Sequence, residues 1–292
     1  MWDRIIRGAR VVDPKNGFDG IADVAVEDGR VAAVATSLAG RAKLDEEADG
    51  LVLMPGLIDS HLHLGSVFGS AYGQRMAALA GVTTCLDMAG PFTDILGTIP
   101  YAGAGINVAS IEGFSPDAVF GTLTPSRGEI RSWLEKTVEA GSVGVKLMGG
   151  HWPLPLETCR NVVEIANEMG VYVAWHAGST TAGSNIEGMH EVIDAVKGLK
   201  LHLAHINAYC RGRINPVEEE AAEAIRLLIE NPNIWSEGYV SPMNGTILTC
   251  DEKGEVIDHV TRTCLKTYGF PITAEGIRGA IRKGVLFVVR DT

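Results

Sequence analysis

Two histidines at the end of a predicted β-strand are spaced as a metal-binding pair. The strand begins near Leu51, and His61 and His63 stand two residues apart where it ends. Because side chains at positions i and i+2 of a strand point to the same face, both imidazoles can reach one metal ion. Packed or surface histidines would show the same spacing, so the pair alone does not decide between the two interpretations.

Two more histidines stand at the ends of later predicted strands. His176 follows the strand over 171–175, and His205 lies near the end of the strand over 199–206. His202 precedes His205 by three residues, so we expect these two to point to opposite faces, and we choose His205 because it is nearer the C-terminal end. A lone histidine at such a place is more often structural, but histidines at three strand ends favour a metal site.

Lys146 lies inside an apolar strand predicted over 143–147. An ammonium group is costly to bury unless it is paired or modified. One interpretation is an ion-paired lysine, or one whose stem is buried while its amine reaches water. The other is a neutral amine that has reacted with carbon dioxide, because the resulting carbamate is an anion able to bridge two metal ions.

The elements that must position these residues alternate between strands and helices. Besides the strands already named, we predict strands near 81–87, 106–110 and 234–236, and helices over 69–80, 127–140, 155–169, 186–196 and 216–229. Strand–helix repeats with apolar strands indicate a parallel sheet, either doubly wound or closed into a barrel. No GxGxxG follows the first strand, which disfavours a dinucleotide-binding fold. An apolar run over 285–289 is the candidate for an eighth strand.

We predict a small β-domain over residues 1–53 and a second, larger domain over residues 54–292. Polar and apolar residues alternate over 22–26, and the segment Glu27-Asp28-Gly29-Arg30 is typical of a hairpin turn. A lone hairpin is marginally stable, so this domain needs further strands or a partner element against which to pack.

Composition and charge exclude several classes of protein. The chain has 292 residues, 46% of them apolar, and a formal charge of -11 without a basic stripe, so nucleic acid is not an expected partner. Five cysteines without a CxxC pair argue against a disulfide framework and favour the cytoplasm. The N-terminus has charges where a signal peptide is apolar, and no apolar run approaches the ~20 residues of a membrane span.

The segment MPGLIDSHLH, residues 54–63, resembles the PGxIDxHxH signature of the amidohydrolase superfamily. The N-terminal segment ending in DGRVAAVA is similar to the small domain of that family. The order of two histidines, a lysine and two further single histidines resembles the binuclear branch with dihydroorotases, hydantoinases, D-aminoacylases and the formylmethanofuran dehydrogenase A subunit. Over about residues 1–240, the resemblance implies an α/β fold: a (β/α)8 TIM-type barrel with a small N-terminal β-sandwich domain.

The resemblance also implies a ligand set and a reaction. His61 and His63 would bind one divalent metal ion. His176 and His205 would bind a second, and Lys146, carboxylated by CO2, would bridge the two. The imidazole-rich set favours zinc, with manganese, iron and cobalt as alternatives. The implied reaction is hydrolysis of a C–N bond in a small amide or cyclic amide by a metal-bound hydroxide.

One part of the family pattern is not matched in full. The family places an aspartate after strand eight as metal ligand and general base, and Asp291 is the candidate for this catalytic role. We expect the C-terminal part of the barrel and sandwich to be missing from this chain. The chain is then a fragment, a degenerate member, or one subunit whose missing part lies on a second polypeptide; we also expect a homo-oligomer.

Several other residues have two interpretations. Cys85 ends the second strand, where some relatives place a metal ligand, but a small buried thiol is the better interpretation. Residues of two loops either line a substrate pocket or serve loop structure: Gly149, Gly150, His151, Asn207 and Tyr209. The run Glu218-Glu219-Glu220 opens a helix, where negative charge suits the helix dipole.

Two other functions stay open beside hydrolysis of a C–N bond. The same scaffold supports related metal reactions, namely deamination, lactone hydrolysis and formyl transfer within a complex. A non-catalytic relative that serves as a scaffold or binding subunit is the second alternative. The expected loss of the C-terminal part favours a scaffold, whereas a lysine inside an apolar strand argues for an enzyme.

Overall fold

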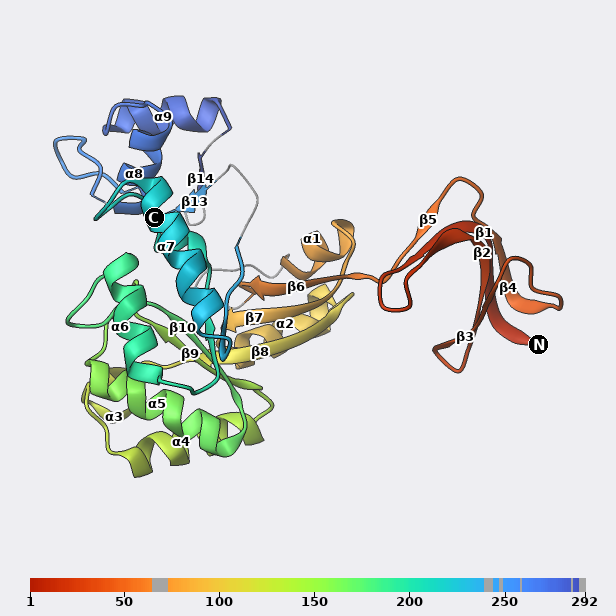
Figure 1. Cartoon of the computed structure of the whole chain (residues 1–292), viewed down its shortest axis with the longest axis horizontal. Helices are drawn as coiled ribbons and strands as arrows, with labels where there is room; N and C mark the ends of the chain where they lie inside the picture. Colours follow the sequence, from red (N-terminus) through yellow and green to blue (C-terminus); the bar gives the residue numbers. More distant parts are fainter. Residues whose placement is uncertain (65–72, 239–243, 247–248, 258, 285, 289–292) are drawn as a thin grey trace. The chain divides into compact units, whose positions relative to one another are not determined.

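Figure 1 shows the chain, a computed structural model that describes residues 1–64, 73–238, 244–246, 249–257, 259–284 and 286–288. By its internal contacts the chain divides into two compact units, Met1–Ile58 and Asp59–Thr292. Within the described ranges, no helix has both the length and the apolar character needed to cross a membrane.

The first unit is a five-stranded β-sheet. Its strands are β1 (Trp2–Asp13), β2 (Phe18–Glu27), β3 (Arg30–Ala35), β4 (Ala42–Glu47) and β5 (Val52–Leu53). They lie in the order β3-β2-β1-β4, and β5 also pairs with β1. The predicted hairpin turn is confirmed, because Glu27 pairs with Arg30 while Asp28 and Gly29 have φ angles of 51° and 70°. Positive φ at both central residues is what a type I′ turn requires.

The second unit contains a parallel sheet of seven strands. These are β6 (Leu57–Leu62), β7 (Val82–Ala89), β8 (Asn107–Gly113), β9 (Gly144–Met148), β10 (Tyr172–His176), β11 (Leu201–Leu203) and β12 (Ile234–Trp235). Each strand lies beside its successor in the chain, from β6 at one edge to β12 at the other. The strand order of a doubly wound sheet reverses in the middle. The order of this sheet does not reverse, which is the strand order of a barrel. Within the described residues the sheet stays open at its two edge strands.

Helices connect successive strands of this sheet. They are α1 (Gly73–Leu79), α2 (Phe92–Ala102), α3 (Pro116–Phe120), α4 (Arg127–Glu139), α5 (Leu156–Met169), α6 (Ile186–Val196) and α7 (Val217–Glu230). The start of α4 has a capping box, in which Ser126 Oγ accepts from Glu129 N and Glu129 Oε2 accepts from Ser126 N. The first residues of the helix predicted over 69–80 lie outside the described part of the chain.

The C-terminal segment differs from the prediction. A strand forms within 285–289, β14 (Leu286–Val288), but it pairs in parallel with β13 (Asn244–Thr246) as a separate two-stranded sheet. The helices α8 (His259–Thr267) and α9 (Ala274–Arg282) lie between these two strands in the chain. Buried residues of the segment form a cluster of their own: Val256, Cys264, Leu265, Ile277, Ala280 and Leu286. Because Leu286 packs in this separate cluster, its strand does not extend the seven-stranded sheet.

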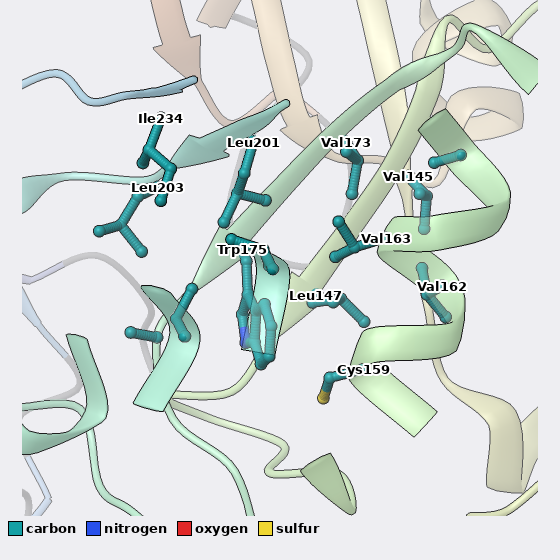
Figure 2. Close-up of a cluster of buried hydrophobic side chains, with 14 of the residues drawn as sticks. Val145, Leu147, Cys159, Val162, Val163, Val173, Trp175, Leu201, Leu203 and Ile234 are labelled. Atoms are coloured by element: carbon teal, nitrogen blue, oxygen red, sulfur yellow. The ribbon is translucent and has the colours of Figure 1, made fainter. Parts of the chain in front are cut away.

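The main apolar core lies between the sheet and its covering helices (Figure 2). Strand β9 contributes Val145 and Leu147 to this core, and α5 faces them with Val162 and Val163. Because side chains alternate along a strand, Lys146 points to the opposite face of the sheet. That inner face also carries the apolar cluster of Met88, Ile111 and Ala174. The lysine is therefore placed among apolar side chains rather than near water.

Glu220, in the first turn of α7, is fully buried. Its carboxylate accepts hydrogen bonds from the backbone N–H groups of Gly212, Ile214 and Asn215, at 2.6, 2.8 and 3.0 Å. Burial raises the pKa of this carboxyl, but the backbone donors outweigh burial and hold the pKa below its usual value. The helix-dipole interpretation therefore omits the main role of Glu220, which is to fix the loop between β11 and α7.

Replacing Glu220 with glutamine is expected to lower the free energy of unfolding at pH 7 by about 2 kcal/mol, because glutamine has one acceptor oxygen for several donors. Glu218→Gln, on the exposed side of the same turn, serves as control. The pKa of Glu220 is lowered by folding, so its contribution is complete above pH 4.5 and is lost as the pH falls below it. Urea unfolding at pH 7 and pH 4 measures both effects; equal stability of the two variants would contradict this role.

Candidate metal centre

Four strands of the seven-stranded sheet position the predicted ligands. His61 lies on β6 and His63 just beyond it, Lys146 lies on β9, and His176 is the last residue of β10. His205 follows β11 by two residues. Because the strands are parallel, their C-terminal ends meet at one edge of the sheet, where active sites of such folds are built.

The structure brings the four predicted histidines together. Ring centroids are 5.2 Å apart for His61 and His63, 5.1 Å for His61 and His205, and 4.3 Å for His176 and His205. Burial lowers the pKa of each ring, to about 3 for His63. The imidazoles are therefore neutral at pH 7, which is the state that binds a metal ion.

Lys146 is the buried cation beside this cluster. Its side chain is 1% exposed, and Nζ donates to Met88 Sδ at 3.8 Å, a weak acceptor. Burial lowers the pKa of the Lys146 amine to about 7, although the charge of Glu237 opposes the shift. The Lys146 charge in turn contributes to lowering the pKa of His61, His63 and His205. A substantial share of this amine is thus neutral at physiological pH and able to act as a nucleophile.

Glu237 is a residue of the site that the sequence reasoning missed. It follows β12 by two residues, and its carboxylate accepts from His61 Nδ1, from His202 Nε2 and, at 2.9 Å, from the backbone N–H of His205. Burial raises the pKa of Glu237, but the hydrogen bonds from His202 and His61 outweigh burial and hold the pKa well below its usual value. Its position after a strand of the parallel sheet is the same signal that singled out the histidines.

The expectation that His202 and His205 face opposite ways is wrong. Strand β11 ends at Leu203, and His205 has a φ angle of 37°, so strand alternation no longer applies where the chain turns. Both rings lie beside that of His61, with centroids 6.5 Å away for His202 and 5.1 Å for His205. Both nitrogens of His202 have protein partners, Glu237 at Nε2 and Tyr172 Oη at Nδ1, 2.6 Å away. His205 Nδ1, in contrast, is buried without a hydrogen-bond partner.

This donor set fits a divalent metal ion in type and place. Neutral imidazoles lie near a buried amine, and the unpartnered Nδ1 of His205 is the kind of buried polar atom that a bound ion satisfies. Among the described side chains, no group of three or more His, Cys, Asp or Glu residues is arranged to hold an ion as it stands. In this arrangement Ser184 Oγ lies 2.7 Å from His176 Nε2, so that nitrogen already has a protein partner.

The remaining predicted residues take different places. The His151 ring lies 5.3 Å from that of His176, so this loop borders the site. Tyr209 is fully buried and links two strand ends, since its hydroxyl donates to Ala204 O and accepts from Ala177 N, which makes it a structural residue. Cys85 is buried in an apolar cluster, and burial raises the pKa of its thiol to about 11. Asp291 lies outside the described residues.

Known proteins resemble the chain in both sequence and fold, although no family model matches it. Dihydroorotase from Geobacter sulfurreducens is 33% identical over 295 residues, which cover 86% of this chain and 68% of that protein. Allantoinase from Solibacter usitatus is 31% identical over 252 residues, 71% of this chain and 52% of that protein.

Solved structures share the fold. N-acyl-D-glutamate deacylase from Bordetella bronchiseptica, solved with zinc, superposes with a TM-score of 0.66 at 20% identity, over 85% of this chain and 60% of that one. A D-hydantoinase gives a TM-score of 0.59 at 17% identity, over 98% of this chain and 67% of that one. At these identities the two matches show a shared fold.

The chain belongs to the amidohydrolase superfamily, as its PGxIDxHxH-like segment indicates. It spans 67 to 68% of the length of two matching Geobacter dihydroorotases and 60% of the length of the Bordetella deacylase.

Proposed function

We propose that the protein hydrolyses a C–N bond of an amide or cyclic amide in a metal-dependent reaction. The observation that carries this proposal is the cluster of neutral, partly buried imidazoles near a buried lysine whose pKa is lowered to about 7. In the proposed assignment His61 and His63 hold one divalent ion, for which zinc is the first choice. His176 and His205 hold the second.

Lys146 supplies the bridging ligand in this proposal. Its neutral amine adds to CO2, forming an N–C bond and releasing one proton, and the product is a carbamate with two oxygen donors. The apolar residues around the side chain, Met88 among them, disfavour the ammonium form and so favour this addition. The lysine lies on the inner face of β9, the same face that carries the histidines.

Metal ions bound here would polarise a carbonyl oxygen and lower the pKa of a water from near 16 toward about 7. The residues of this chain hold the reacting groups in place. His63, His176 and His205 are partly buried, which limits the access of bulk water to them. Asp291 is the residue expected to transfer the proton, but the strand before it, β14, pairs with β13 outside the seven-stranded sheet, so we assign this role to no described residue of the chain.

A substrate panel tests the proposed reaction. The dihydroorotases and the allantoinase among the relatives support cyclic ureides as the first class to assay, with N-acyl amino acids second. Lactones and dipeptides complete the panel. Turnover of a cyclic ureide or N-acyl amino acid by zinc-loaded protein is the expected result. Turnover of lactones alone would exclude C–N hydrolysis, and failure of the whole panel with full metal loading would favour a scaffold role.

A further inference from the structure

Glu237 accepts three hydrogen bonds at the candidate metal centre, and one of them comes from the ring of a candidate ligand, His61. One carboxylate oxygen, Oε1, accepts from His61 Nδ1 and from the backbone N–H of His205, and the other, Oε2, accepts from His202 Nε2. An ionised carboxylate only accepts hydrogen bonds, so each imidazole nitrogen that faces it carries a proton. The contact therefore selects one tautomer of His61, with the proton on Nδ1.

The selected tautomer decides which nitrogen can bind a metal ion. A neutral imidazole has one N–H and one lone pair, so a proton on Nδ1 leaves Nε2 of His61 as the ligating atom. The same carboxylate binds Nε2 of His202, and Tyr172 Oη lies at Nδ1 of that ring. Because both of its ring nitrogens have protein partners, His202 is not among the proposed metal ligands. His202 is held further by Trp235, whose ring stacks on the imidazole at 6.1 Å between centroids and 24° between planes.

The contact also joins the two edges of the open sheet. His61 lies on β6 and Glu237 follows β12, and these are the first and last strands of the seven. Backbone hydrogen bonds do not link the two edges in the described residues, so the side chain of Glu237 connects parts of the site that the sheet leaves separate. A hydrogen-bond network then runs from Tyr172 through His202 and Glu237 to His61.

We propose that Glu237 is a positioning residue, which holds His61 in the tautomer and orientation that present Nε2 to a metal ion and which ties β6 to the end of β12. The part that concerns metal binding rests on the proposed function. Carboxylates that orient a ligating histidine typically change metal affinity by about 10- to 100-fold when they are removed.

The test uses Glu237→Gln, which keeps the volume but offers one acceptor oxygen for three donors. A matched control is Glu164→Gln on α5, because Glu164 also bridges two donors, Arg127 and Arg160, and its side chain is 26% exposed against 22% for Glu237. Glu237→Asp, which retains the charge on a shorter side chain, is measured as well and replaces the glutamine variant if that one does not fold.

The first readout is the tautomer of His61 in the metal-free protein. It is measured by NMR from the ring-nitrogen signals of samples labelled with ¹⁵N-histidine, and the His61 signals are identified by their absence in His61→Gln. We expect a proton on Nδ1 in the wild type and in Glu164→Gln. A mixture of tautomers is expected in Glu237→Gln and Glu237→Asp. An unchanged His61 pattern in the Glu237 variants would overturn the proposal.

The second readout is zinc affinity, from competition with a chromophoric chelator. We expect about 10- to 100-fold weaker binding in Glu237→Gln, a smaller loss in Glu237→Asp and no change in Glu164→Gln. Equal zinc affinity in the wild type and both Glu237 variants would overturn the metal part of the proposal. If the wild type binds no zinc but shows the expected tautomer change, the proposed function fails while the positioning of His61 stands.

Discussion

Replacing Lys146 with methionine is expected to remove bound metal from the site and to lower turnover by roughly 1000-fold, since metal activation is worth several kcal/mol. Lys146 is 1% exposed, and its amine contacts a thioether rather than a carboxylate, which is the setting of a reactive neutral amine. Methionine fills a similar volume without a nucleophilic nitrogen, so the carbamate cannot form. Metal content, kcat/KM and the ¹³C carbamate signal in labelled bicarbonate measure the effect.

The control for this change is Lys136→Met, at an exposed position of α4. It is expected to keep metal, turnover and the carbamate signal. Because methionine removes a buried amine without leaving a cavity, Lys146→Met should remain folded, with a free energy of unfolding at least equal to that of the metal-free wild type. Two metal ions and full turnover in Lys146→Met would show that Lys146 is not a ligand.

The second large effect is expected for Gly150→Ala, in the loop after β9. A Cβ at this position would lie 1.9 Å from His176 Nε2 and 2.4 Å from both neighbouring ring carbons. These distances are far below contact, and the His176 ring is held by Ser184, so the ring must move. A displacement of about 1 Å at a reacting centre costs on the order of 100-fold in rate. We therefore expect turnover to fall by this amount and the ion held by His176 to bind more weakly.

Gly97→Ala in α2 is the matched control, because a Cβ there meets nothing within 4 Å. Alanine in a helix interior should raise the free energy of unfolding by about 0.5–1 kcal/mol relative to glycine and leave turnover unchanged. Steady-state kinetics and zinc competition on both variants separate the two cases. Full activity in Gly150→Ala would mean that the position of His176 is not important for the reaction.

The sequence predicts most elements of the fold because their signals are local. Ser126 and Glu129 specify a capping box within four residues, and Asp28-Gly29 specifies a hairpin turn. The spacing of apolar residues distinguishes strands from helices along the chain. Because the strands are parallel, their C-terminal ends lie at one edge of the sheet. For these reasons the sequence alone predicts that His61 and His205 lie close together, and in the structure their ring centroids are 5.1 Å apart.

The parts that could not be predicted depend on contacts between distant segments. Glu237 is 176 residues from His61 in the chain, and nothing near Glu237 indicates its partner. The position of His202 beside the same carboxylate depends on where β11 ends, a boundary that periodicity does not define. Likewise, the pairing of β14 with β13 follows from the separate cluster around Leu286 rather than from the apolar run itself.

The central claim is that this chain binds metal ions and needs them for hydrolysis. Elemental mass spectrometry of the wild-type protein, as purified, after chelation and after reconstitution with zinc and bicarbonate, tests it most directly when turnover is measured on the same samples. The account predicts a metal content close to the two ions per chain that the resemblance implies. Chelation should remove metal and turnover together, and zinc should restore both. Turnover of amides that persists in protein proven free of metal would contradict it.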